Sequence, residues 1–424
     1  MRFLYSLVIR LHAFGIKLAS FFSKKAHLWC SGRKNIFQLL ENKCTNKISI
    51  VWFHCASLGE FEQGKPVMEK IKQNEKDVTL LVSFFSPSGF EIIKNDPIVD
   101  IITYLPIDTK KNAKRFINIV KPKKVFFIKY EFWYNYLQEL ANSEIPFYFV
   151  STIFRKNQYF FKKYGIWFLK HLKKCSFFFL QNANSKILLN KHGILNTCIT
   201  GDTRFDRVYD IAQQNYTLDF ITTFKNEKKI LVAGSTWAPD EKILSELLQK
   251  IYSNYKLVIA PHRVDNDRIT QVLKTFSSFS VVRFSEKGSK DFSNYDVLII
   301  DTIGILSKIY KYADISYVGG AFKTGLHNIL EAAVFEKPLF FGPHYDKFNE
   351  AVELVEKDAA FSISNAKEMA QKIIFFNDNP SSYEATCALC KNYIKQNLGA
   401  TNKIMSCLNL KFQFFLDNHN LEKL

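Results

Sequence analysis

Short apolar runs rich in β-branched and aromatic residues alternate along this chain with longer segments in which apolar positions recur at helical spacing. Strands that alternate with helices predict parallel sheets with right-handed crossovers. One polar stretch, DIAQQNYTLDFITTFKNEKK at residues 210–229, interrupts the alternation, and we interpret it as a linker between two doubly wound α/β domains. The expected strands are 48–53, 78–85, 101–104, 125–128, 147–151, 177–180 and 198–200 before the linker, and 230–233, 257–260, 297–300, 315–318 and 338–341 after it.

The N-terminal segment MRFLYSLVIRLHAFGIKLASFF, residues 1–22, predicts an amphipathic helix. A signal peptide places its cations before the apolar run, whereas this segment spreads them along one face. We interpret the helix as lying in a membrane interface, with its cations toward anionic headgroups. A single transmembrane span and a helix packed on the protein itself are the alternatives. At about 100° per residue the polar residues Arg2, Ser6, Arg10, Lys17 and Ser20 share a narrow arc.

Length and charge narrow the class of protein. A chain of 424 residues exceeds one ordinary hydrophobic core, which also favours two domains. The 58 Lys and Arg residues exceed the 40 Asp and Glu residues by 18, so the partners we expect are anionic: nucleic acid, phospholipid headgroups or phosphorylated substrates. A generally basic proteome would explain the same excess.

The eight cysteines do not form a metal-site pattern. Only Cys387 and Cys390 form a C-x-x-C pair, and neither a second pair nor two histidines complete a zinc site. The spacing of Cys387 and Cys390 fits two half-turns of one helix. The scattered positions of the eight cysteines are typical of a reducing compartment without disulfides.

Five successive strands of the second half end in polar or glycine-rich motifs. In open α/β sheets ligands bind in the crevice at the carboxyl ends of the strands. The five motifs therefore predict a ligand site on the second domain. They are Gly234-Ser235-Thr236, Pro261-His262-Arg263, Asp301-Thr302 with Gly304, Gly319-Gly320 and Gly342-Pro343-His344.

Two short motifs offer candidate acids. Ser57-Leu58-Gly59-Glu60 has the S-x-x-E form of a capping box, in which both side chains satisfy free N–H groups. A carboxylate at a helix start also tends to stay ionised at neutral pH, as a general base for a sugar hydroxyl requires. Asn328 to Glu331 follow the second glycine pair and suit a nucleotide, with N–H groups for phosphate and Glu331 for ribose hydroxyls. Glu331 could equally favour a helix N-terminus.

Neither a P-loop nucleotide site nor a D-x-D metal site is expected in this chain. No GxxxxGK[ST] is present, which argues against a P-loop ATPase. Asp265-Asn266-Asp267 has the D-x-D form of metal-dependent glycosyltransferases, but we place it in the first turn of a helix and expect no metal site. His262 and Arg263 suit a phosphate or a carboxylate, and a solvated pair is the alternative.

In combination these motifs resemble the 3-deoxy-D-manno-octulosonic acid (Kdo) transferases of lipopolysaccharide biosynthesis. WFHCASLGEFEQGKP resembles the family's W-x-H-x-x-S-x-G-E signature, and SFFSPSGFE, AGSTWAPDE and APHR resemble three further motifs. The longest similarities are VGGAFKTGLHNILEAA, which resembles G-G-S…G-G-H-N-x-L-E-P/A, and FGPHYDKFNEA, which resembles G-P-H-x-x-N-F.

The resemblance implies a GT-B enzyme in which two Rossmann-like domains face a cleft. The family moves Kdo from CMP-Kdo to the lipid A precursor, an anionic lipid, with inversion and without a metal or other cofactor. The implied segments are 1–22 as a membrane anchor, 23–209 as the acceptor domain, 210–229 as the linker, 230–400 as the CMP-sugar domain, and 401–424 as a helix that can pack back on the N-terminal domain. The implied location is the cytoplasmic face of the inner membrane.

The resemblance also assigns residues. Glu60 matches the family's catalytic base, and Lys129, Glu131 and Arg204 match other active-site positions. Lys129 stands where the family has the first glutamate of E-T-E-L-W-P-N, which reverses the charge and puts the role of that position in doubt. The donor positions are Ser235, Thr236, Pro261, His262, Arg263, Ile303, Gly304, Ile305, Gly319, Gly320, Asn328, Ile329, Leu330 and Glu331.

Two other functions fit parts of the pattern. Another GT-B enzyme, such as a UDP-sugar transferase or a 2-epimerase, would share the strand-end motifs. A non-catalytic basic protein that binds a membrane surface or nucleic acid would share the charge. Because aromatic-basic RNA motifs are absent, nucleic acid is not an expected partner.

Overall fold

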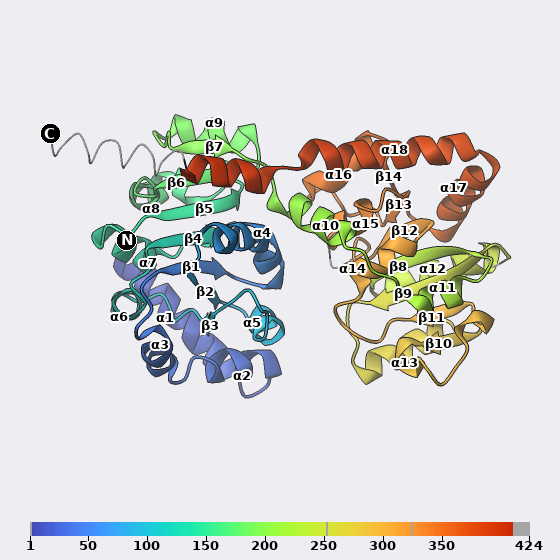
Figure 1. Cartoon of the computed structure of the whole chain (residues 1–424), viewed down its shortest axis with the longest axis horizontal. Helices are drawn as coiled ribbons and strands as arrows, with labels where there is room; N and C mark the ends of the chain where they lie inside the picture. Colours follow the sequence, from blue (N-terminus) through green and yellow to red (C-terminus); the bar gives the residue numbers. More distant parts are fainter. Residues whose placement is uncertain (1, 252, 324, 410–424) are drawn as a thin grey trace. The chain divides into compact units, whose positions relative to one another are not determined.

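A computed structural model describes residues 2–251, 253–323 and 325–409 of the chain (Figure 1). It divides the chain into two compact domains. The N-terminal domain comprises the residues up to Arg207 and the chain from Leu398 onward, and the C-terminal domain comprises Val208–Asn397. The stretch 210–229, which the sequence marks as a linker, contains the end of helix α10 (Thr203–Gln213) and all of helix α11 (Asp219–Lys225).

The N-terminal domain is built on a parallel seven-stranded sheet in the order β3-β2-β1-β4-β5-β6-β7. Along β1, Trp52 faces one core cluster while Val51 and Phe53 face another. Because helices cover both faces, all six residues of β1 are buried, which explains its continuous apolar run. The strands are β1 (Ile50–Cys55), β2 (Thr79–Phe84), β3 (Ile101–Tyr104), β4 (Lys124–Ile128), β5 (Phe147–Thr152), β6 (Phe177–Leu180) and β7 (Thr197–Ile199).

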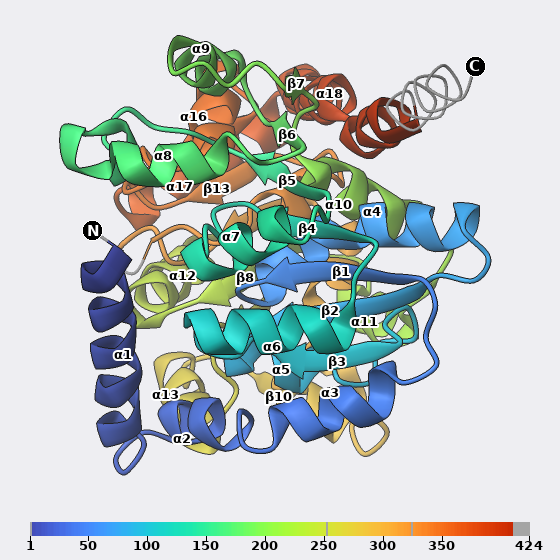
Figure 2. The same ribbon diagram turned by 90° about the vertical axis from the view of Figure 1, so that its left-hand side faces the viewer.

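Two sets of helices cover this sheet. Helices α3, α6, α7, α8 and α9 contribute to the cluster on the Trp52 face, and α4 and α5 contribute to the other. Figure 2 shows α6 in front of the strands and α1 at the edge of the domain. The helices are α1 (Arg2–Ala19), α2 (Lys24–Ser31), α3 (Ile36–Cys44), α4 (Leu58–Asn74), α5 (Pro87–Ile93), α6 (Lys110–Val120), α7 (Tyr134–Asn142), α8 (Ile166–Leu172) and α9 (Ala183–Lys191), with 3-10 turns η1 (Tyr159–Phe161) and η2 (Lys163–Gly165).

The C-terminal domain repeats this plan with a parallel sheet in the order β10-β11-β9-β8-β12-β13-β14. All twelve strands expected in the two domains are present, and the two parallel α/β sheets confirm the predicted fold class. Two strands were not expected, β10 and β14, and both are three residues long and lie at sheet edges. The strands are β8 (Lys229–Thr236), β9 (Tyr255–Pro261), β10 (Val281–Arg283), β11 (Val297–Ile299), β12 (Ile315–Val318), β13 (Leu339–Phe341) and β14 (Ala360–Ser362).

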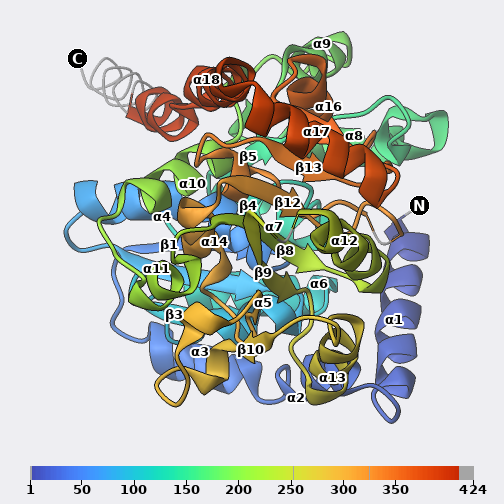
Figure 3. The ribbon, with the colours of Figure 1, turned by 90° about the vertical axis from the view of Figure 1, so that its right-hand side faces the viewer.

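The main helices of this domain pack on one core cluster. Helices α12, α13 and α17 contribute buried residues to the cluster that also contains Leu231, Leu257 and Tyr317 of the sheet. Figure 3 shows α12 and α17, which are in contact, from this side. The helices are α12 (Ala238–Ile251), α13 (Asn266–Thr275), α14 (Leu306–Ile309), α15 (Leu330–Ala333), α16 (Asn349–Glu356), α17 (Ala366–Asp378) and α18 (Pro380–Asn397), with 3-10 turns η3 (Phe284–Glu286), η4 (Phe292–Asn294) and η5 (Tyr310–Tyr312).

Helix α1 is fixed to the N-terminal domain along one face. Tyr5 donates a 2.5 Å hydrogen bond to Oδ2 of the buried Asp108 and accepts one from the backbone N–H of Tyr134. Its ring also packs on Tyr134 and Trp167. Among the described residues, no helix has both the length and the apolar character needed to cross a bilayer.

The described residues after α18 return to the N-terminal domain. Residues 400–409 are helical, and Ile404, Met405 and Leu408 join the core cluster beside α4. Asp206 of α10 caps this helix, since its two carboxylate oxygens accept hydrogen bonds from the backbone N–H groups of Gly399 and Thr401, each 2.7 Å long, and from the Thr401 hydroxyl. The remainder of the expected helix 401–424, residues 410–424, lies outside the described residues.

Replacing Asp206 with alanine removes all three accepted hydrogen bonds. We expect the free energy of unfolding to fall by about 1–2 kcal/mol, as for other lost N-caps. Native-state hydrogen exchange should quicken mainly in residues 400–409. Asp206→Asn keeps one acceptor oxygen and should show a smaller effect, whereas unchanged exchange in Asp206→Ala would contradict the capping role.

Candidate active site

Glu60 lies in the first turn of α4, directly after the central strand β1. Its Oε2 atom accepts a hydrogen bond from the backbone N–H of Ala56. The side chain of Ser57, the N-cap of α4, makes no capping hydrogen bond. The capping box expected from the S-x-x-E spacing is therefore only half formed, because the serine does not reciprocate.

The ionisation of Glu60 also differs from the expectation. Burial and, next, the negative charge of Glu131 raise the pKa of Glu60 to about 7, although the N–H groups of Ala56 and Ser57 and the cation of Lys129 lower it. The expectation that Glu60 tends to stay ionised at neutral pH counted the helix start and not the burial or the second carboxylate, which raise the pKa. A carboxyl group with a pKa near neutral can accept and release a proton under working conditions.

Glu131 lies against two ring nitrogens from different elements. Its Oε2 atom lies 3.0 Å from Nε2 of His54, which is buried in β1, and 2.8 Å from the indole Nε1 of Trp133. Nδ1 of His54 lies 3.0 Å from the carbonyl oxygen of Ser83 on β2. No role was expected for His54 or Trp133, although His54 stands in the quoted motif WFHCASLGEFEQGKP and Trp133 lies two residues after Glu131.

Lys129 follows β4 in a left-handed backbone conformation, with a φ of 61°. Its backbone N–H donates to the carbonyl oxygen of Val150, which holds the turn against β5. The positive charge of the Lys129 ammonium group lowers the pKa of Glu60 and the pKa of Asp202. Lys129 therefore interacts electrostatically with both carboxyl groups. Non-glycine residues with positive φ are uncommon and concentrate at functional sites.

Arg204 is joined to the helix that carries Glu60 through Asp202. Its Nε and NH2 atoms lie 2.8 and 2.7 Å from Oδ2 of Asp202, and Oδ1 of that carboxylate accepts from Gln63 of α4. Burial alone raises the pKa of Asp202, but Arg204, with a smaller effect from Lys129, brings it below the ordinary value. The structure thus brings Glu60, Glu131 and Lys129 together. Arg204 is linked to this group through its ion pair with Asp202.

The strand-end motifs of the C-terminal domain meet because β9, β8 and β12 are parallel neighbours. A Cβ atom on Gly319 would lie 2.6 Å from the carbonyl oxygen of Ser235, so only glycine allows the two loops to approach. Gly320 has a φ of 99°, which also favours glycine. The backbone N–H of His262 donates to the carbonyl oxygen of Thr236, which ties the ends of β8 and β9.

A buried acid that sequence analysis did not single out ties the same loops together. Asp240 of α12 accepts hydrogen bonds from the backbone N–H groups of Trp237, at 2.8 Å, and Gly320, at 3.1 Å. It also accepts a 2.7 Å hydrogen bond from the Tyr317 hydroxyl. Burial raises the pKa of Asp240, and these donors lower it. The acid therefore fixes the loop after β8 to the loop after β12.

Three aromatic rings stack beside these loops. The ring centroids of Trp237 and His262 are 4.8 Å apart, and those of His262 and His327 are 4.3 Å apart. Trp237 donates from Nε1 to Nε2 of His327 at 3.1 Å. Burial, with His262 next, lowers the pKa of His327 to about 4, and burial followed by Arg263 lowers that of His262. Both imidazoles are therefore neutral at pH 7, so His262 does not provide the cation that the sequence suggested.

The other donor candidates differ in what they can offer. The amide of Asn328 donates to Glu331 at 2.9 Å, while its buried Oδ1 has no hydrogen-bond partner among the described residues. Ile329 and Leu330 are buried in the core, so they can offer a ligand only backbone groups. The helix that follows this loop, α15, begins at Leu330.

The remaining candidates lie on exposed loops. Ile303 is 69% exposed, and Gly304 beside it has a φ of 95°. Arg263 pairs with Asp265, which is the N-cap of α13. Within the described ranges, no group of three or more His, Cys, Asp or Glu side chains is arranged to hold a metal ion.

Comparison with known proteins gives a consistent family. A family model described as 3-deoxy-D-manno-octulosonic-acid transferase (kdotransferase) matches residues 31–207. The chain is 26% identical to the 3-deoxy-D-manno-octulosonic acid transferase of Aquifex aeolicus, over 76% of this chain and 84% of that protein. It is 27% identical to that of Rickettsia bellii, over 86% and 87%. A bifunctional glycosyltransferase/methyltransferase of Fusobacterium nucleatum is 25% identical over 79% of this chain, which spans about half (53%) of that protein.

Solved structures give the fold. UDP-GlcNAc 2-epimerase from Neisseria meningitidis superposes with a TM-score of 0.61 at 13% identity, over 86% of this chain and 100% of that one. MurG from Acinetobacter baumannii superposes with a TM-score of 0.52 at 12% identity, over 85% and 99%. These likenesses, together with the two parallel sheets, assign the GT-B fold. With this fold, the family model over residues 31–207 and these relatives, the chain is similar to the 3-deoxy-D-manno-octulosonic acid transferases.

Proposed function

We propose that this glycosyltransferase moves Kdo from CMP-Kdo to the lipid A precursor, with inversion and with Glu60 as the general base. In this reaction Glu60 takes the proton of an acceptor hydroxyl as the hydroxyl oxygen bonds to the anomeric carbon of Kdo. The bond from that carbon to the CMP phosphate breaks on the opposite face, and CMP leaves. The observation that carries the proposal is the half-buried carboxyl of Glu60 at the carboxyl end of β1, with a pKa of about 7.

The charge around Glu60 supports an anionic acceptor. Lys129 acts on the same carboxyl, and Arg204 lies beyond it on Asp202. A cationic surface with a net chain charge of +18 attracts a phosphorylated lipid and orients it before reaction. We therefore propose that Lys129, despite replacing a glutamate, serves acceptor binding rather than proton transfer.

The C-terminal domain supports a nucleotide donor. The loops after β8 and β12 approach closely at Gly319 and offer backbone N–H groups suited to a phosphate. Glu331, oriented by Asn328, is an acceptor suited to ribose hydroxyls. The free Oδ1 of Asn328 is a further polar atom for a ligand. No metal or further cofactor is part of the proposed reaction.

Helix α1 supports a location on the cytoplasmic face of the inner membrane. Tyr5 fixes one face of the helix to the domain, and the opposite face exposes large apolar side chains to solvent. Such a helix can insert its apolar face into the acyl boundary while Arg10 and Lys17, at the border, meet anionic headgroups. The exposed apolar residues are Phe3, Leu4, Leu7, Val8, Leu11, Phe14 and Leu18, followed by Phe21 and Phe22.

Replacing Glu60 with glutamine tests the base. Transfer should fall by at least about a hundredfold, because the amide cannot take the proton. In the wild type, kcat/KM should rise about tenfold per pH unit up to about pH 7 and then level off, as the carboxyl loses its proton. The pH dependence of Kdo transfer from CMP-Kdo to a tetraacylated, bisphosphorylated acceptor, followed by mass spectrometry, measures both.

The matched control is Glu62→Gln on the same helix, which removes an ion pair with Arg207 and should retain most transfer. Calorimetric titration of Glu60→Gln with CMP should match the wild type. Because burial raises the pKa of Glu60, its ionisation weakens folding as pH rises from 4.5 through 7. The variant should therefore be more stable than the wild type at pH 8. Full turnover would refute the base assignment, and tighter binding of UDP than of CMP would refute the donor.

Replacing Leu7 and Leu11 with glutamate tests the membrane face. We prefer these substitutions to deletion of α1, because deletion would also remove Tyr5 from Asp108 and so disturb the domain. Binding to anionic phospholipid vesicles should fall by at least about a hundredfold, since two large side chains lose their burial. Ile187→Glu, at another exposed apolar residue of the same domain, is the control and should bind as the wild type does. Equal vesicle binding by all three proteins would contradict the proposal.

A further inference from the structure

Trp133 makes directed contacts on two sides. Its Nε1–H lies 2.8 Å from Oε2 of Glu131 and 3.0 Å from Nε2 of His54. Its ring stacks on Phe85, with centroids 5.1 Å apart and planes inclined by 28°. The indole is therefore held by hydrogen bonds at its edge and by stacking on its face.

His54 is held on its other side by Ser83. Nδ1 lies 3.0 Å from the carbonyl oxygen of Ser83 and 2.9 Å from its hydroxyl oxygen. The Ser83 hydroxyl accepts from Trp52 at 2.7 Å. If Nε2 is unprotonated, it and Oε2 of Glu131 are two acceptors 3.0 Å apart, and the N–H of Trp133 is the donor they share. If Nε2 is protonated, both rings donate to Glu131.

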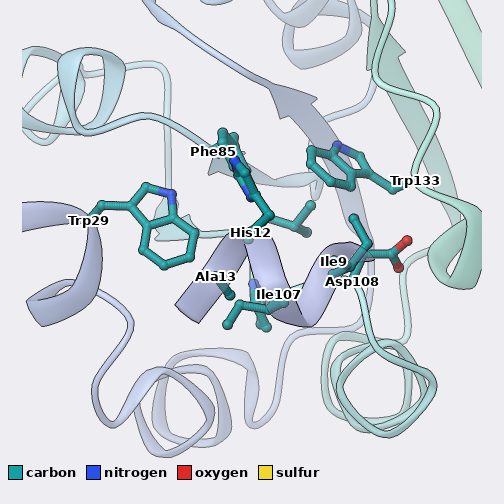
Figure 4. A pocket seen from close by; sticks show the side chains of 10 residues that line it. Ile9, His12, Ala13, Trp29, Phe85, Ile107, Asp108 and Trp133 are labelled. Atoms are coloured by element: carbon teal, nitrogen blue, oxygen red, sulfur yellow. The ribbon is translucent and has the colours of Figure 1, made fainter. Parts of the chain in front are cut away.

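Phe85 is in turn held from the side of α1. His12 of α1 stacks on it, Trp29 meets it edge to face, and the Arg33 guanidinium lies 5.4 Å from its ring centroid. Figure 4 shows Phe85 between Trp29 and Trp133, above residues of α1. The hollow that they line has a volume of ≈ 10 Å³, which is room for about one water molecule. The indole of Trp133 therefore has little space in which to turn away from Glu131.

We propose that Trp133 is a positioning residue that holds the carboxylate of Glu131 on His54, so that the negative charge of Glu131 stays beside Glu60. The proposal rests on the proposed function of Glu60 as the base. Trp133 touches neither the donor nor the reacting hydroxyl in this role. Its effect passes through the negative charge of Glu131, which it keeps in one place.

The groups that face the two acids come from several elements. β1 contributes His54 and Cys55, and the loop after β4 contributes Lys129. Asp202 and Arg204 lie beyond Lys129. Of these groups, His54 is in direct contact with Glu131, so removing the Trp133 donor leaves that carboxylate with its contact to His54 alone. The carboxylate can then turn away from His54, and its charge acts less on Glu60.

Trp133→Phe tests this role, because phenylalanine keeps a ring on Phe85 and removes the N–H donor. We expect the acid limb of the kcat/KM profile to move to lower pH by about one unit. Glu131→Gln should move the limb in the same direction, and Trp133→Phe should add no shift in the Glu131→Gln background. Trp167→Phe is the control, since Trp167 packs on Tyr5 and Tyr134. The acid limb of its kcat/KM profile should stay at the pH of the wild type.

An unmoved limb in Trp133→Phe, or additive shifts in the double variant, would overturn the positioning role. Carbon NMR titration of the labelled Glu60 carboxyl follows its ionisation without turnover. If Glu60→Gln keeps full activity, the base assignment fails, yet this titration still reports whether Trp133 controls the ionisation of Glu60. Failure of the proposed function and failure of the positioning role are thus distinguished.

A separate observation concerns two thiols of the N-terminal domain. Sγ of Cys198 on β7 and Sγ of Cys407 on the helix 400–409 are 3.6 Å apart, although the residues are 209 positions apart in the chain. Both side chains are half-buried and therefore partly accessible. Ile404 and Leu408 pack in the core on either side of Cys407, which holds its helix in this register.

The geometry points to an oxidisable pair at Cys198 and Cys407. Each thiol gives up its proton, the two sulfurs give up two electrons in total, and an S–S bond forms between them. A disulfide oxidant such as glutathione disulfide accepts the two electrons and the two protons and is released as two thiols. The sulfurs need to approach to about 2.05 Å, and the bond would tie the returning helix covalently to the sheet.

Treatment of the folded protein with glutathione disulfide tests the pair. The product should lose the mass of two hydrogens, contain a peptide that links Cys198 to Cys407, and unfold at a higher temperature. Cys198→Ser should abolish the cross-link, and Cys387→Ser, within the C-x-x-C pair of α18, should leave it intact. Separate glutathione adducts on Cys198 and Cys407, or full alkylation of both after oxidation, would overturn the proposal.

Discussion

The site of this enzyme depends on two carboxyl groups kept close together in a partly buried place. Burial and the charge of Glu131 favour the protonated form of Glu60, while the N–H groups at the start of α4 and the cation of Lys129 favour its anion. The first set outweighs the second, and the pKa of about 7 is the result. A fully solvated glutamate would be a weaker base, and a fully buried one would rarely be free of its proton.

Much of the fold could be predicted because parallel sheets covered on both faces leave a strong signal. Strands such as β1 and β4 are buried at every position, so they appear in the sequence as unbroken apolar runs. β10 and β14 are three-residue strands at sheet edges and include half-buried residues, and such short segments do not differ from loops in their pattern. The order of the strands follows from contacts that no local pattern contains.

Candidate site positions could be chosen from the sequence, but their partners could not. Glu60 was chosen for its S-x-x-E motif and the family resemblance, and the glycine pair at Gly319 because motifs at strand ends meet at one edge of a parallel sheet. His54 and Glu131 are 77 residues apart in the chain, and only the pairing of β1 with β4 brings them to 3.0 Å. Burial likewise decides the ionisation of Glu60 and the neutral state of His327, and burial is a property of the folded chain.

The lysine at position 129 is explained by the same balance. A glutamate there would place a third carboxyl group near Glu60 and Glu131, and its charge would raise the pKa of Glu60 rather than lower it. The ammonium group instead offsets part of the effect of Glu131 and helps to keep Asp202 ionised for its pair with Arg204. In this chain the positive charge of Lys129 therefore keeps the pKa of Glu60 in the neutral range.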